Sequence, residues 1–170
     1  MKKTLFILIG LFISLTNAQE LAIPTFLEKW ENSKAYLIQL AEAMPQEKYT
    51  YKPTAREMDF REQLIHIRGN MLWLSGNYFL NKKIKKEDLA VSTLDKDELI
   101  LLISEGFDSV AEIVKTMKPE DLSAKVDFFA GEKTKFQILN LLQDHVTHHR
   151  GQLIVYLNLN KIEPPRYTGW

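Results

Sequence analysis

The residues with the clearest chemical potential are the histidines, because three of the four in the chain fall in one short cluster. His145, His148 and His149 lie in the sequence His-Val-Thr-His-His-Arg-Gly-Gln, and His66 lies far upstream. Residues four apart on a helix lie about 40° from each other around the axis and one turn apart along it. His145 and His149 can therefore bind one divalent metal ion through neutral ring nitrogens. His148 points to the other side of the expected face, which indicates a supporting or surface position.

The segment around this cluster carries the signals of a long helix. Thr134 and Gln137 have the spacing of a capping box, which satisfies amide groups left free at a helix start. The positions that then recur at spacings of three and four are Ile138, Leu142, His145, His149, Gln152, Tyr156 and Leu159. Two histidines in a buried face destabilise a protein unless their nitrogens are bound. The spacing alone leaves two interpretations open, a metal site and a pair of structural histidines.

Three further segments have helical periodicity. The first follows Pro24 and ends near Pro45, the second begins at Asp59 with a capping box and runs to about Leu80, and the third follows Asp95 and ends before Pro119. No segment has the alternation of a strand. The sequence therefore predicts an all-α fold, a four-helix bundle. His66 lies in a polar lane of the second helix, about 100° from its apolar stripe, so periodicity does not direct it toward the histidine pair.

The first 18 residues have the form of a cleavable signal peptide. Lys2 and Lys3 precede an apolar run, and Thr16-Asn17-Ala18 gives a cleavage site. We expect residues 1–18 to be removed and residues 19–170 to form one domain, exported with the periplasm as the expected compartment. The apolar run is short for a bilayer span, so we expect no stable membrane insertion after cleavage, and an uncleaved anchor is the weaker alternative.

Composition excludes several classes of function. The absence of cysteine excludes disulfides, thiolate metal ligands and a cysteine nucleophile. The full chain has 22 basic and 22 acidic residues, and removal of Lys2 and Lys3 leaves a charge of about −2. We therefore expect no nucleic acid partner.

The cluster and several other motifs resemble the DinB-like superfamily. The matching pieces are His145 to Gln152, Tyr156-Leu157, the tail Pro164 to Tyr167, the first loop Met44 to Tyr49 with Pro53, and the second-helix sequence Leu64 to Ile67. The resemblance covers nearly all of residues 19–170. It implies a four-helix bundle that binds a divalent metal ion through one histidine of the second helix and a pair on the last helix. By position these ligands are His66, His145 and His149.

The resemblance also indicates which functions to expect. A site with three imidazoles leaves a position for water or substrate, and zinc or nickel is the expected ion. One hypothesis is therefore a metal-dependent hydrolase or thiol-dependent transferase that acts on a small molecule. The alternative is a non-catalytic exported metal-binding or stress-related protein, with a homodimer through apolar helix faces as an option. Asp144, Gln152 and Tyr156 are candidate supporting residues, and no catalytic base is identified beyond the weak candidates His148 and Glu62.

Overall fold

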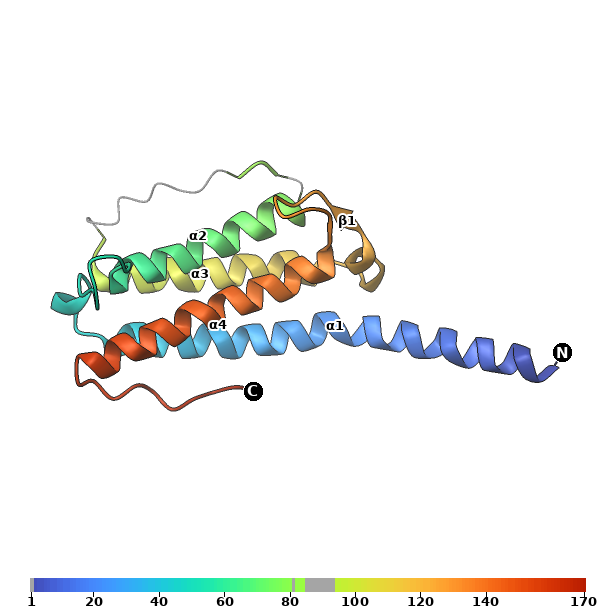
Figure 1. The fold of residues 1–170 in the computed structure, drawn as a ribbon, viewed down its shortest axis with the longest axis horizontal. Coiled ribbons are helices and arrows are strands. Elements are labelled where there is room, and N and C mark those ends of the chain that lie inside the picture. Colours follow the sequence, from blue (N-terminus) through green and yellow to red (C-terminus); the bar gives the residue numbers. More distant parts are fainter. Residues whose placement is uncertain (1, 81, 85–93) are drawn as a thin grey trace.

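Four long helices form a bundle, as the sequence predicted (Figure 1). The computed structural model describes residues 2–80, 82–84 and 94–170, with side chains from residue 21 onward. Within these residues the helices are α1 (Lys2–Ala43), α2 (Phe60–Tyr78), α3 (Lys96–Lys115) and α4 (Lys135–Leu159). Both α1 and α2 pack against α3 and α4. The N-terminal part of α1 extends past the end of the bundle (Figure 1).

Contacts between helix starts and ends show the relative directions of the first three helices. The Arg61 guanidinium at the start of α2 donates to the Leu94 carbonyl just before α3, so α2 and α3 begin at the same end of the bundle. Lys96 Nζ donates to the carbonyls of Glu42 and Met44, 2.6 and 3.0 Å away, which places the end of α1 there as well. The helices α2 and α3 are therefore parallel to each other and antiparallel to α1. The charged segment Asn81 to Leu94 predicts a connector between α2 and α3, and its residues 81 and 85–93 lie outside the described residues.

Capping boxes begin three of the helices at the predicted residues. Asp59, Asp95 and Thr134 each accept a hydrogen bond from the backbone N–H three residues later, and that later residue's side chain accepts from the cap's own N–H. Such a cap is worth about 1 kcal/mol. The first helix differs from the prediction, because α1 continues upstream through Pro24 and begins at Lys2. Pro24 is exposed, and the apolar segment before it is itself helical.

The core confirms the predicted buried faces of the first two helices. Trp30 of α1 is 1% exposed, its indole N–H donates to the Phe107 carbonyl at 3.0 Å, and the two rings lie 4.6 Å apart between centroids. Helical spacing predicts one apolar stripe from Phe26 to Met44 and a second from Phe60 to Tyr78. Tyr78 is half-buried, and the other members are buried: Phe26, Trp30, Ser33, Leu37, Leu40, Met44, Phe60, Leu64, Ile67, Met71 and Leu74.

The predicted buried face of α4 was partly wrong. Leu159 is 55% exposed, and His145 and Gln152 are only half-buried. The buried positions include instead Val146, Arg150, Leu153 and Leu157. The buried face is rotated around the helix axis relative to the predicted one. The pattern did not reveal this face because it includes a charged residue, Arg150. The Arg150 guanidinium lies 5.1 Å from the centroid of the Tyr36 ring, a cation–π contact that lets the charged group pack inside.

A short β-ribbon, which the sequence did not predict, precedes α4. Strands β1 (Lys125–Val126) and β2 (Lys133–Thr134) pair antiparallel, and Gly131 turns the chain between them with a φ of +90°. Two-residue strands are too short for an alternating pattern. Two 3-10 helices, Gln46–Lys48 and Pro119–Ser123, complete the described elements. No helix among the described residues combines the length and the apolar character that a membrane span requires.

Candidate metal centre

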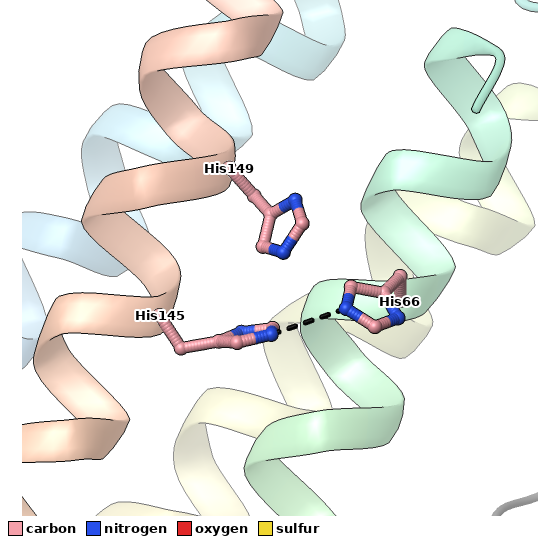
Figure 2. Close-up of side chains that lie close together, drawn as sticks. All are labelled: His66, His145 and His149. Atoms are coloured by element: carbon pink, nitrogen blue, oxygen red, sulfur yellow. Dashed lines mark hydrogen bonds between the residues drawn. The ribbon is translucent and has the colours of Figure 1, made fainter. Parts of the chain in front are cut away.

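The three histidines that the family resemblance named come together between α2 and α4. His66 lies in the middle of α2, and His145 and His149 lie one turn apart on α4 (Figure 2). His149 is buried at 8% exposure, whereas His66 and His145 are half-buried. The cluster therefore sits at the edge of the α2–α4 interface, with its deepest ligand candidate on α4.

The three rings are close enough to share one ion. One ring nitrogen from each histidine lies within 4.8 Å of those of the other two. His145 Nε2 and His66 Nε2 are 3.1 Å apart and share a hydrogen bond (Figure 2). The ring centroids are 4.4 to 4.9 Å apart. Nitrogens bound tetrahedrally to one zinc ion at about 2.0–2.1 Å are separated by about 3.3 Å, so a small inward movement of the rings makes the set fit.

Burial keeps His149 in the neutral form that a metal ligand needs. Desolvation, together with the neighbouring rings of His66 and His148, lowers the pKa of its imidazole from 6.5 to about 4. A neutral imidazole offers one nitrogen lone pair and carries a proton on the other nitrogen. His149 is therefore not protonated at neutral pH and does not repel a cation.

A glutamine of α2 holds the second nitrogen of His149. Gln63 Oε1 lies 2.6 Å from His149 Nδ1, and Gln63 is 2% exposed. The Gln63 amide nitrogen lies 2.5 Å from Gln152 Oε1 and 3.3 Å from the Tyr156 hydroxyl oxygen. Tyr156 in turn donates to the Met58 carbonyl at 2.7 Å. Contacts of this kind orient metal-binding histidines in proteins.

A comparison with protein families identifies the family of this chain. The family model described as DinB family matches residues 15–168. The chain belongs to the DinB family. Among curated proteins this DinB family member is similar to the uncharacterized protein YjoA of Bacillus subtilis strain 168, with 27% identity over 138 residues, which cover 76% of this chain and 85% of YjoA.

Solved DinB-like structures share the fold of this DinB family protein. The crystal structure of YjoA from B. subtilis superposes with a TM-score of 0.70 at 21% sequence identity, covering 85% of this chain and 97% of that one. A DinB-like protein from Bacillus cereus ATCC 10987 gives a TM-score of 0.71 at 19% identity, with coverages of 84% and 95%. At these identities the likeness concerns the fold.

Of the other candidate residues in this DinB family protein, two lie in the hydrogen-bond network and two are exposed. Gln152 and Tyr156 lie in the hydrogen-bond network around Gln63, as expected of supporting residues. His148 is exposed, and its Nε2 lies 2.9 Å from the Gln152 amide nitrogen. Asp144 is exposed and lies outside the network.

Glu62 does not belong to the site as a base. Its carboxylate accepts from the Asp59 backbone N–H at 2.7 Å and pairs with Lys52 Nζ at 3.0 Å. These contacts lower the pKa of Glu62. Glu62 therefore serves the start of α2.

Gln63 is the residue that sequence reasoning missed. It lies beside His66 in the polar lane of the second helix. The available signal was its spacing, because Gln63 and His66 are three residues apart and so lie on one side of α2. Helical periodicity does not connect that side to His149, 86 residues later, and the family resemblance connects only His66.

A surface groove lies along the first half of α4, before His145. Its volume is about 330 Å3, and it is lined by Phe128, Lys133, Gln137, Ile138, Asn140, Leu141 and Asp144. Asp144 precedes His145 directly and Leu141 precedes it by one helical turn, but none of the three histidines lines the groove.

Proposed function

We propose that this DinB family protein binds a divalent metal ion through His66, His145 and His149 and uses it in a reaction on a small molecule. The observation that carries the proposal is the convergence of three ring nitrogens within 4.8 Å, from α2 and α4, which pack against each other. Zinc and nickel suit an all-nitrogen ligand set, and the ion taken up follows availability.

The cluster supports a reactive site more than a closed structural one. Structural zinc sites have four protein ligands, whereas three protein ligands leave a position for water or substrate. The described residues supply three candidate ligands in this group. When bound, the ion supplies Lewis acidity and lowers the pKa of a water or thiol that it binds.

The chain's own residues then have separate tasks. His66, His145 and His149 hold the ion, and Gln63 orients the His149 ring. The groove lined by Leu141, Asp144 and Phe128 accommodates the part of the substrate that extends from the reacting group.

Hydrolysis is favoured over thiol transfer by the expected location. We propose that residues 1–18 direct export and are cleaved after Ala18, which leaves every core side chain described here in the mature chain, beginning with Ile23. An exported enzyme meets water rather than the low-molecular-weight thiols of the cytosol. Mass spectrometry of the protein secreted from its host tests this step, because a mature N-terminus at Gln19 is expected and an intact Met1 contradicts it.

The reaction is tested with a generic ester. Protein stripped with a chelator and reloaded with zinc should hydrolyse p-nitrophenyl acetate, and the same protein without metal should not. The control is the zinc-treated His145→Ala, His149→Ala variant, which removes both α4 ligands. Equal rates for the two zinc-treated proteins would contradict catalysis at this site. Tight zinc binding without any hydrolysis or thiol transfer would favour the alternative, a non-catalytic metal-binding protein.

A further inference from the structure

In the hydrogen-bond network around His149, each donor and each acceptor can be assigned. The assignment begins at a backbone carbonyl. The Met58 carbonyl can only accept a hydrogen bond, so the Tyr156 hydroxyl, 2.7 Å away, must donate to it. The Tyr156 oxygen is then left to accept from its second neighbour. Burial raises the pKa of Tyr156, so the hydroxyl keeps its proton at neutral pH.

This direction determines how the Gln63 amide is oriented. The Gln63 group that faces the Tyr156 oxygen at 3.3 Å must be a donor, which is the amide nitrogen and not the amide oxygen. The same nitrogen donates to Gln152 Oε1 at 2.5 Å. An amide rotated by 180° would place its oxygen against the Tyr156 oxygen, where no hydrogen is available. The Gln63 oxygen therefore faces His149.

The orientation of Gln63 in turn determines the tautomer of His149. Gln63 Oε1 is an acceptor, so His149 Nδ1, at 2.6 Å, must carry the ring proton. His149 Nε2 then presents its lone pair on the side of His66 and His145 (Figure 2). In the opposite tautomer Nε2 would carry the proton, and the ring could not bind a metal through that atom.

We infer that Tyr156 and Gln63 are positioning residues that fix His149 in the tautomer able to bind a metal ion through Nε2. The inference rests on the proposed metal site, but the tautomer itself is a property of the metal-free protein. Tyr156 acts on His149 through Gln63, whose amide nitrogen lies 3.3 Å from the Tyr156 oxygen. Its role is distinct from packing, although its ring also meets Phe60 and Tyr51 at centroid distances of 6.4 and 6.1 Å.

The first test reads the tautomer directly in wild-type protein. Long-range 1H–15N correlation spectra of the metal-free, 15N-labelled protein at neutral pH distinguish a protonated ring nitrogen from an unprotonated one. The expected result for His149 is a protonated Nδ1 and an unprotonated Nε2. A protonated Nε2 would overturn the inference, whatever the protein's affinity for zinc.

The second test removes the Tyr156 hydroxyl, on which the orientation of the Gln63 amide depends. Tyr156→Phe deletes the hydroxyl, so the Gln63 amide can take either orientation and His149 populates both tautomers. Zinc affinity should then fall by at least about tenfold, the usual effect of losing a contact that orients a ligand. Tyr51→Phe is the matched control. It deletes a hydroxyl from the neighbouring ring, and Tyr51 makes no side-chain hydrogen bond within the described residues, so its affinity should stay within about twofold.

The decisive test is a rescue that packing cannot explain. A carboxylate accepts a hydrogen bond with either oxygen, so Gln63→Glu orients His149 without help from Tyr156. Adding Tyr156→Phe to Gln63→Glu should therefore change zinc affinity less than about threefold, whereas Tyr156→Phe alone costs at least about tenfold.

A double variant that binds zinc at least about tenfold more weakly than Gln63→Glu would show that the tyrosine acts through packing and would overturn the inference. If the tautomer is as expected in wild-type protein but zinc does not bind it, the proposed metal function fails and the tautomer assignment stands.

Discussion

His66 of α2 and His145 of α4 face each other with their Nε2 atoms 3.1 Å apart, although 79 residues separate them in the chain. One of the two nitrogens carries the proton that the pair shares. Both must present a lone pair to bind one ion, so the proton moves to Nδ1 or leaves when a metal enters. Metal binding at this pair is therefore coupled to a small rearrangement of protons. His149 needs no such rearrangement, because Gln63 already holds its Nδ1.

Single replacements of the histidines should rank by their place in the cluster. His145→Ala and His149→Ala each remove a ligand from α4 and should weaken zinc binding by at least about tenfold, and His66→Ala should weaken it somewhat less. His148→Ala is the control, because His148 is exposed and lies outside the group of three, although its ring meets that of His149 edge to face at 4.9 Å between centroids. Competition titration with a zinc chelator measures all four. Equal losses in His148→Ala and His149→Ala would show that the ligands are wrongly assigned.

Filling the groove should separate catalysis from metal binding. Leu141→Trp places a larger side chain in the groove beside His145, so zinc affinity should be retained while hydrolysis of p-nitrophenyl acetate by the zinc-loaded protein falls several-fold. Leu101→Trp adds the same ring at a position of α3 that is 59% exposed, and its rate should equal that of wild type. An unchanged rate in Leu141→Trp would exclude this groove from substrate binding.

The bundle and the starts of α2, α3 and α4 could be predicted from the sequence because they depend on local signals. Asp59, Asp95 and Thr134 begin helices through side chains only three residues away. The apolar stripes of the first two helices could be predicted for the same reason, since each repeats within one segment.

The site needed more than local signals. Periodicity identified the pair His145 and His149 but placed His66 at the side of its helix, and only the family resemblance brought it to the cluster. The structure explains this position, because the ligands lie along the edge where α2 meets α4 and not in the centre of the core. The apolar pattern marks core positions, so a site at an interface edge is displaced from the stripe. Gln63 was missed because its partner His149 is distant in sequence.

The metal-free protein should lose stability in mildly acidic solution. The pKa of His149 in the folded protein is about 4, below its usual value of 6.5. Between these values the unfolded chain binds a proton that the folded protein does not, so the free energy of unfolding falls as pH decreases from 6.5 to about 4. Urea denaturation in the presence of a chelator measures this slope. His149→Gln lacks the titrating ring and should lose less stability over the same range, and an identical slope in both proteins would contradict the assignment.

The end of α4 offers a test of backbone strain. Lys161 adopts a φ of +60°, a left-handed conformation that favours glycine at this position after a helix. Its N–H donates to the Asn158 carbonyl at 2.9 Å, and the Ile162 N–H donates to the Leu157 carbonyl at 3.0 Å, so the turn is well defined. Lys161→Gly should raise the free energy of unfolding by roughly 0.5–1 kcal/mol in urea denaturation. Lys135→Gly, in the first turn of α4, should lower it instead, and a destabilised Lys161→Gly variant would contradict the strain.

The most direct test of the central claim is the metal content of the purified protein. Protein prepared without added metal, and again after incubation with zinc or nickel and removal of free ions, is analysed by inductively coupled plasma mass spectrometry beside the His145→Ala, His149→Ala variant. The account predicts close to one divalent ion per wild-type chain and none in the variant. Wild-type protein that stays metal-free after incubation with either ion, or a variant that retains as much metal as wild type, would contradict a metal centre at these histidines.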